Sequence, residues 1–203
     1  GSLADDKGQA AVKVKVDTTN MQAYEIYLKA RELFIARTDL AESIRLFEQV
    51  VQMDPNFARG WEGLAAVSAV VESWGIVDRD YNGMVKPAAE RALQLDPSLS
   101  MPWAALGMAE QNERDVDWAK SLELSAKAIQ ADPKNATAYL WRSIAWLNLG
   151  FFEKAIADPD NGFLKQMQVS VTDDGMWYEN SWGYHFYALR ALVETAEGAR
   201  HLG

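Results

Sequence analysis

The sequence predicts an all-α protein made of stacked two-helix units. The tetrapeptide Gln-x-Asp-Pro occurs three times along the chain, ending at Pro55, Pro97 and Pro133. Within the units that these prolines separate, apolar residues recur at intervals of three and four, the spacing of one helix face. No segment alternates apolar and polar residues with period two, so strands are not expected.

Aromatic residues keep the same period as the prolines. Trp61, Trp103 and Tyr139 each lie six residues after one of the prolines, so both markers are separated by 42 and then by 36 residues (55 to 97 to 133). Two markers that share one period indicate an internal repeat, which is the sequence signature of a stacked architecture.

Helix boundaries are signalled in order along the chain. Asp39 with Glu42 has the spacing of a capping box that opens a second helix. Pro102 suits a first helical turn, where its missing N–H costs little. Asn135 can cap the helix that follows it. Gly150 can end that same helix.

These positions resemble the tetratricopeptide repeat, a family of antiparallel helix pairs about 34 residues long. The family has a large residue, Leu and Gly or Ala on the first helix, Ala and an aromatic residue on the second, and then Pro. Four units match it over about residues 22–158. The matching residues are Tyr27, Ala30, Phe34, Phe47, Val50 and Pro55; Trp61, Leu64, Ala65, Ala89, Ala92 and Pro97; Trp103, Leu106, Gly107, Ala128 and Pro133; and Tyr139, Ala145, Trp146, Gly150, Phe152 and Ala155. The resemblance implies a right-handed superhelical stack with a C-terminal capping helix.

The predicted organisation is a short leader followed by one repeat domain over residues 20–203. Residues 1–19 are expected to be a tag remnant and a flexible linker. The repeats are expected over about 24–57, 58–99, 100–135 and 136–168, and the capping helix over about 176–199. The second repeat carries about eight extra residues between its helices, from Ser73 to Asn82, and Pro159 should stop or bend the last repeat helix.

A narrower resemblance concerns the opening segment, residues 18–31. It is similar to a subgroup of bacterial multidomain signalling proteins, in which the repeats follow an adenylate-cyclase-like, winged-helix or TolB-like domain. This resemblance implies that the chain is the interaction or regulatory part of a larger bacterial protein.

Composition argues against several classes of function. The chain has 203 residues and a net charge of −9, from 20 Lys and Arg against 29 Asp and Glu. Such a surface repels phosphate backbones, so nucleic-acid partners are not expected. No apolar run reaches the roughly 18 residues of a membrane-spanning helix, so direct membrane insertion is not expected. With no cysteine and two histidines, disulfides, thiolate sites and multi-histidine metal sites are not expected either.

The family's inward positions, on the first helix of each repeat, predict a concave groove for a protein or peptide partner. The residues expected to contact the partner are Leu28, Glu32, Glu62, Ala66, Met108, Gln111, Leu140, Ile144 and Asn148. The further inward positions are Glu25, Ile35, Arg59, Ala69, Met101, Ala104 and Thr137. Because these positions are mostly acidic or aliphatic, a clamp for a terminal carboxylate is not expected. The sequence leaves open whether the last helix covers the groove.

One loop resembles part of a cation-binding loop. Asp78, Asp80, Asn82 and Gly83 match the first half of a calcium-binding loop, but the twelfth position is Ala89 where a Glu is required. The favoured interpretation is a polar inter-helix loop in which Asn82 and Gly83 turn the chain. No metal and no cofactor are expected.

The expected last helix is rich in aromatic residues, among them Trp177, Trp182, Tyr184 and Phe186. These side chains either seal the end of the stack or form an interface with a partner or a second copy of the chain. No nucleophile, metal cluster or phosphate-binding loop is recognisable, so the chain is predicted to be a non-catalytic protein- or peptide-binding module. The alternatives are an oligomerisation element and a ligand- or ion-sensing domain attached to a signalling enzyme.

Overall fold

A computed structural model describes residues 18–151 and 154–155, and every regular element in this part of the chain is a helix. The helices are α1 (Met21–Ala36), α2 (Leu40–Met53), α3 (Ala58–Val71), the short 3-10 helix η1 (Glu72–Trp74), α4 (Asn82–Leu95), α5 (Met101–Asn112), α6 (Trp118–Ala131) and α7 (Ala136–Asn148). The predicted all-α class is confirmed.

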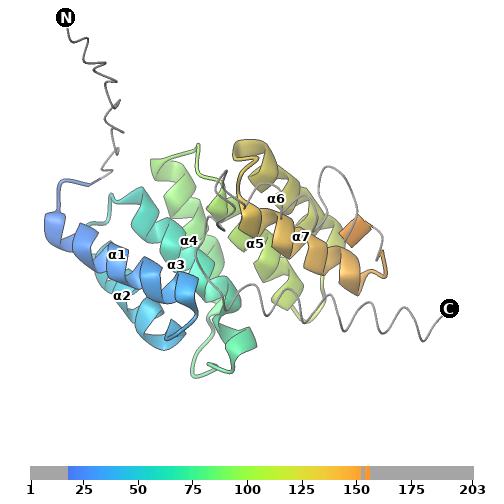
Figure 1. Cartoon of the computed structure of the whole chain (residues 1–203), viewed down its shortest axis with the longest axis horizontal. Helices are drawn as coiled ribbons and strands as arrows, with labels where there is room; N and C mark the ends of the chain where they lie inside the picture. Colours follow the sequence, from blue (N-terminus) through green and yellow to red (C-terminus); the bar gives the residue numbers. More distant parts are fainter. Residues whose placement is uncertain (1–17, 152–153, 156–203) are drawn as a thin grey trace, which may run out of the picture.

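The helices pair in sequence order. Helix α1 packs against α2, α3 against α4 and α5 against α6. Contacts of α3 with α2 and α5, and of α5 with α4 and α7, join successive pairs. Figure 1 shows a row of helix pairs that runs from α1 and α2 at one end to α6 and α7 at the other. A stack of the tetratricopeptide type is therefore confirmed for three pairs and the first helix of a fourth. The capping helix expected at 176–199 lies outside the described residues.

Two of the predicted helix starts have the expected caps. Asp39 Oδ1 accepts a hydrogen bond from the Glu42 N–H (2.9 Å) and opens α2. Asn135 Oδ1 accepts one from the Ala138 N–H (3.1 Å) and opens α7. Each bond satisfies one backbone donor that the first helical turn leaves without an intrahelical partner. Both oxygens of the Glu42 carboxylate accept hydrogen bonds from Arg45, one turn further along α2.

Helix α7 ends at the predicted glycine. Gly150 has a φ of 79°, in the left-handed region that glycine adopts without steric cost. Its N–H donates to the Leu147 carbonyl at 3.0 Å, which closes the last turn.

The two sequence markers of the repeat are hydrogen-bonded to each other. The indole N–H of Trp61 donates to the carbonyl of Pro55 (3.0 Å), and the hydroxyl of Tyr139 donates to the carbonyl of Pro133 (3.2 Å). In both units the aromatic side chain reaches back over the turn that separates one repeat from the next. The common spacing of six residues therefore has a structural cause, because the aromatic residue fixes the inter-repeat turn.

Buried serines join the two helices of a pair. Ser43 Oγ on α2 donates to the Ala30 carbonyl of α1, and Ser121 Oγ on α6 donates to the Gly107 carbonyl of α5, both at 2.8 Å. Both serines are completely buried, so each hydroxyl needs its partner to compensate for lost water. A Cβ at position 107 would lie 3.1 Å from the Ser121 carbonyl oxygen, which explains the small residue there.

The extra residues of the second repeat form η1 and a loop before α4. The expected turn at Asn82 and Gly83 is wrong, because both residues lie in the first turn of α4. The Gly83 N–H instead donates to Asp80 Oδ1 (2.8 Å), so this hydrogen bond satisfies a backbone donor in the first turn of α4. The chain reverses earlier, where Gly75 has a φ of 82°.

Thr18 lies in the segment that the sequence assigned to a linker, yet it is buried. Its hydroxyl donates to the carboxylate of Asp54, at the turn between α2 and α3. The Asn20 N–H donates to Thr18 Oγ1 (2.9 Å), and Asn20 Oδ1 in turn caps α1 through the Ala23 N–H (3.1 Å). The residues that precede α1 are thus tied to the first repeat boundary.

Candidate binding groove

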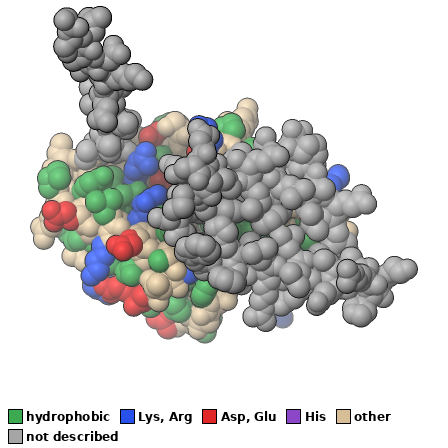
Figure 2. Space-filling model, viewed as in Figure 1, with side chains coloured by type: hydrophobic (Ala, Val, Ile, Leu, Met, Phe, Trp, Pro, Cys, Tyr) green, Lys and Arg blue, Asp and Glu red, His purple; other side chains and the backbone are tan. Residues whose placement is uncertain are grey.

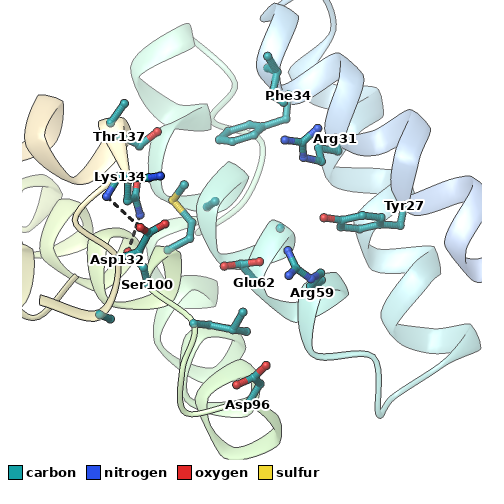
Figure 3. Close-up of a pocket in the computed structure, with 18 of the residues that line it drawn as sticks. Tyr27, Arg31, Phe34, Arg59, Glu62, Asp96, Ser100, Asp132, Lys134 and Thr137 are labelled. Carbon is teal, nitrogen blue, oxygen red and sulfur yellow. Dashed lines mark hydrogen bonds between the residues drawn. The ribbon is translucent and has the colours of Figure 1, made fainter. Parts of the chain in front are cut away.

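A groove of about 640 Å³ lies between α1, α3 and two inter-repeat loops. One loop joins α4 to α5 and the other joins α6 to α7. Figure 3 shows the α1 side chains on one side, the loop side chains opposite, and α3 side chains between them. The lining residues are Tyr27, Arg31, Phe34, Ile35, Arg37, Phe47, Arg59, Glu62, Gly63, Ala66, Asp96, Ser98, Leu99, Ser100, Met101, Ala131, Asp132, Lys134, Asn135, Ala136 and Thr137.

The α1 side of the groove is aromatic. The Tyr27 hydroxyl and the Phe34 ring are directed into it (Figure 3). The Phe47 ring from α2 packs edge-on against Tyr27, with ring centroids 6.1 Å apart. A Cβ at Gly63 would lie 2.1 Å from the Phe47 ring, so the glycine allows α3 to approach this ring closely.

The groove gathers positive charge in a chain that is acidic overall. Its lining includes four basic side chains, Arg31, Arg37, Arg59 and Lys134, and three acidic ones, Glu62, Asp96 and Asp132. The two aspartates take part in the inter-repeat turns. Asp96 Oδ1 accepts hydrogen bonds from the N–H and hydroxyl of Ser98 (3.0 and 2.5 Å), and Asp132 Oδ1 accepts one from the Lys134 N–H (2.9 Å). The groove therefore has a small positive excess, against −9 for the whole chain.

Tyr27 has a charged environment as well as an apolar one. Burial raises the pKa of its hydroxyl above the ordinary value, and the nearby Glu62 carboxylate raises it further. The positive charges of Arg31 and Arg59, and the hydrogen bond of Arg59 to the Tyr27 hydroxyl, act in the opposite direction and lower this pKa. Since the net direction is upward, the Tyr27 hydroxyl stays neutral at physiological pH.

Arg37 is held at the end of α1 by two contacts with one residue. Its backbone is left-handed (φ 54°), and its Nη1 donates to the Phe34 carbonyl at 2.7 Å. The guanidinium carbon lies 4.0 Å from the centroid of the Phe34 ring, a cation–π geometry. These contacts fix a positive charge on the aromatic side of the groove.

An apolar stripe on α1 lies beside the groove. Met21 and Leu28 are seven residues apart, on the same helix face as the groove residue Ile35. Their side chains are 59% and 46% exposed, unusually high for residues of this size. Figure 2 shows apolar, basic and acidic side chains close together on this end of the molecule. The groove and its rim thus combine apolar area with positive charge.

The structure places the predicted contact residues in different environments. Glu62 and Ala66 line the groove, together with four of the seven further inward positions, Ile35, Arg59, Met101 and Thr137, whereas Glu25, Ala69 and Ala104 do not. Leu28, Glu32 and Asn148 are exposed but do not line it, and Met108, Gln111 and Ile144 are half-buried. Leu140 is buried, with 8% of its surface exposed, so it offers no open contact surface.

In the structure α1 turns Tyr27 and Arg31 toward the groove and leaves Leu28 and Glu32 outside it.

Gln111 belongs to the framework that holds the repeats together. Its Nε2 donates to Ser121 Oγ (3.0 Å) and to the Trp141 carbonyl (3.2 Å), which ties α5 to α6 and α7. The half-buried, doubly bonded amide is therefore explained by packing between repeats.

The oxygen ligands of the calcium-like loop have separate structural partners. Asp78 Oδ1 accepts a hydrogen bond from the Tyr81 hydroxyl (2.7 Å), which lowers the pKa of this carboxyl. Asp80 caps Gly83, as described above, and the Asn82 amide donates to Glu113 Oε1 (2.9 Å). These bonds support the interpretation of the loop as a structural element.

Two other kinds of functional feature, metal clusters and membrane-spanning helices, are absent from the described residues. Within 18–151 and 154–155, no cluster of three or more His, Cys, Asp and Glu side chains could hold a metal ion. No helix in this part of the chain is both long and apolar enough to cross a bilayer. The aromatic residues Trp177, Trp182, Tyr184 and Phe186, and Pro159, lie outside these ranges.

Comparisons with known proteins give little beyond the fold. No protein-family model matches the sequence, and no curated protein matches it. Two solved structures with similar folds are both crystal structures of MamA. One has 19% identity and a TM-score of 0.47, covering 71% of this chain and 77% of that one. The other has 17% identity and a TM-score of 0.37, covering 74% and 93%. With scores this low, the assignment of the fold rests on the helix pairs of the chain itself.

Proposed function

We propose that this chain is a non-catalytic module that binds a peptide segment of a protein partner in the groove between α1, α3 and the two inter-repeat loops. The observation that carries the proposal is the composition of this groove. The half-buried apolar side chains Ile35 and Met101 lie in it together with the exposed basic side chains Arg31, Arg59 and Lys134, while only the edges of Tyr27 and Phe34 (8% and 9% exposed) reach its surface. Such a surface suits a ligand with acidic and apolar side chains close together, because each kind of side chain has a complementary contact.

The groove also meets the requirement of a preformed site. Its walls are helices held by buried hydrogen bonds, such as Ser43 to Ala30, and its loop side is fixed by capped turns. A site that is ordered before binding loses less conformational entropy when the ligand arrives.

The test is selection of peptides from a random twelve-residue library on the full-length chain, followed by fluorescence anisotropy with the selected peptides. We expect enrichment of sequences in which Asp or Glu neighbours aromatic or aliphatic residues. Arg31→Glu should weaken their binding by at least about tenfold, because one groove cation becomes an anion.

Lys29→Glu is the matched control, since it makes the same charge change on the same helix. Lys29 is exposed, does not line the groove and lies about 200° around α1 from Arg31. Its substitution should leave binding within about twofold of the wild type. Equal binding to both variants would move the contact surface away from this groove.

The wider setting is also a proposal. The similarity of residues 18–31 to bacterial signalling proteins supports an interaction or regulatory part of a larger protein, and the reading frame upstream of Leu3 in the source gene tests this. A second candidate function, self-association, is favoured by the exposed Met21 and Leu28 on α1. Sedimentation of Leu28→Glu against the wild type tests it, because an α1-mediated dimer should dissociate when a charge enters its interface.

A further inference from the structure

We infer that the groove has a ligand within this same chain, residues 172–187, which occupies it and competes with an external partner. The inference rests on the proposed function, because it takes the groove to be the binding surface. Residues 172–187 lie outside the described part of the chain. Three features connect them to the groove: the groove's charge, the segment's composition and the path of the chain.

The groove favours an acidic ligand with apolar side chains. Arg31, Arg37 and Arg59 stand on the helix side with Glu62, and Lys134 stands on the loop side with Asp96 and Asp132, so the positive excess lies on the helix side (Figure 3). The half-buried Ile35 and Met101 supply apolar surface in the groove.

The segment 172–187 has the complementary composition. It carries three carboxylates, Asp173, Asp174 and Glu179, and no Lys or Arg occurs between Lys165 and Arg190. The same sixteen positions hold six rings, at Trp177, Tyr178, Trp182, Tyr184, Phe186 and Tyr187. Acidic and aromatic side chains so close together are what the groove can accommodate, and aromatic residues dominate binding energy in desolvated contacts.

The path of the chain allows this segment to reach the groove. Each completed pair ends at an Asp-Pro turn, and the turns around Asp96 and Asp132 line the groove. Sixteen residues, 156–171, separate the last described residue, Ala155, from the segment. Sixteen residues can span up to about 55 Å, which is enough to reach the groove from the end of the stack.

The absence of cysteine in the natural sequence allows a direct test by disulfide trapping in the full-length chain. One variant carries Ser98→Cys, at the groove, with Ser181→Cys in the segment. The matched control carries Ser73→Cys with the same Ser181→Cys. Ser73 is also an exposed serine, but it lies in η1, between the two helices of the second pair.

With diamide as oxidant, we expect an intramolecular cross-link in the Ser98 pair at least about tenfold faster than in the Ser73 pair, because docking raises the effective concentration of the thiols. Adding Asp173→Lys and Asp174→Lys should remove this preference, whereas Glu194→Lys with Glu197→Lys should preserve it. Equal rates in the two pairs would overturn the inference. A cross-link mainly between two chains would overturn it in favour of a second copy as the occupant.

Peptide affinity separates this inference from the proposed function. If the segment competes for the groove, Asp173→Lys with Asp174→Lys should tighten binding of the selected peptides by at least about threefold. Preferential cross-linking together with peptide binding that Arg31→Glu does not alter would support the internal ligand and contradict the proposed function. Peptide binding that depends on Arg31 without preferential cross-linking would support the function and overturn the inference.

Discussion

Gly63 is the residue on which the floor of the groove depends most directly. It lies on α3 opposite Phe47, a ring that is 1% exposed and therefore has no space into which it could move. Protein interiors are close-packed, so one additional methyl group at such a contact forces side chains or backbone to shift.

We expect Gly63→Ala to destabilise the chain by about 1–2 kcal/mol. Overpacking costs about 1–3 kcal/mol, and a Cβ only 2.1 Å from the buried Phe47 ring places the cost in the upper part of that range. The higher helix propensity of Ala offsets about 1 kcal/mol of this cost. Urea denaturation followed by circular dichroism measures the change. Phe47→Leu makes room for the methyl group, so the double variant should be more stable than the sum of the two single effects predicts. An unchanged or raised midpoint for Gly63→Ala alone would show that the Phe47 ring has an alternative position.

The position of Tyr27 and Arg31 at the groove could not be predicted from the sequence. The helix containing them was predictable from its apolar spacing, and its core residues Tyr27 and Phe34 were identified as repeat positions. Which face of α1 borders the groove depends on how α1 packs against α2 and α3, and those contacts come from residues further along the chain.

At the scale of elements, Asn135 serves two helices at once. Its Oδ1 caps α7, and its Nδ2 donates to Ser100 Oγ (2.7 Å), whose hydroxyl donates to the Ala128 carbonyl of α6 (2.8 Å). The turn between α6 and α7 is therefore linked to the beginning of α5. Because this turn lines the groove, the same side chain positions Lys134 and Thr137.

Two substitutions separate these roles of Asn135. Asn135→Asp keeps an oxygen for the Ala138 N–H but loses the donor to Ser100, so it should cost about 1 kcal/mol. Asn135→Ala loses both bonds and should cost about 2 kcal/mol. Asp117→Ala removes a cap of the same kind from α6 and serves as a control, with an expected cost of about 1 kcal/mol. Thermal unfolding of the three variants checks the order, and a smaller loss for Asn135→Ala than for Asn135→Asp would contradict it.

Most elements were predictable because their signals are local. The caps Asp39 and Asn135, the stop at Gly150 and the periodic apolar residues all act within a few positions in the chain. The Asn82–Gly83 turn was predicted wrongly because the same residue types also begin helices, and the choice depends on Asp80 and on Asn82's contact with Glu113, 31 residues away.

At the scale of the whole molecule, the stack distributes stability along one direction. Within the described residues, the helix contacts join a pair to its neighbours, and α1 touches α2 and α3. Stability in such an architecture is close to a sum over repeats and their interfaces. A local defect should therefore loosen neighbouring helices more than distant ones.

Native-state hydrogen exchange of Ser43→Ala tests this expectation. Loss of the Ser43 to Ala30 bond, about 1 kcal/mol, should speed exchange about fivefold in α1 and α2. Protection in α6 and α7 should remain as in the wild type. Uniformly faster exchange in all helices would instead indicate a single cooperative unit.

The groove itself could not be predicted from single repeats. It is formed by residues as distant in sequence as Tyr27 and Thr137, which come together only because the repeats curve past one another. Lys134 lies in a turn between repeats, where sequence reasoning assigns residues to caps and turns. The inward positions alone suggested a mostly acidic and aliphatic surface, whereas Arg31 and Arg37 of α1 add positive charge and the turns add Lys134 together with Asp96 and Asp132.

The bonds of Trp61 to Pro55 and of Tyr139 to Pro133 also bear on how such proteins diversify. They fix the geometry of the edge at which the Asp-Pro turns connect one helix pair to the next. The opposite edge, where the two helices of a pair are connected, already carries η1 and its loop, and the stack continues past them. New segments can therefore accumulate on that opposite edge while the recognition surface keeps its shape. For engineering, the loop around Gly75 is the natural place to graft a reporter or a binding epitope.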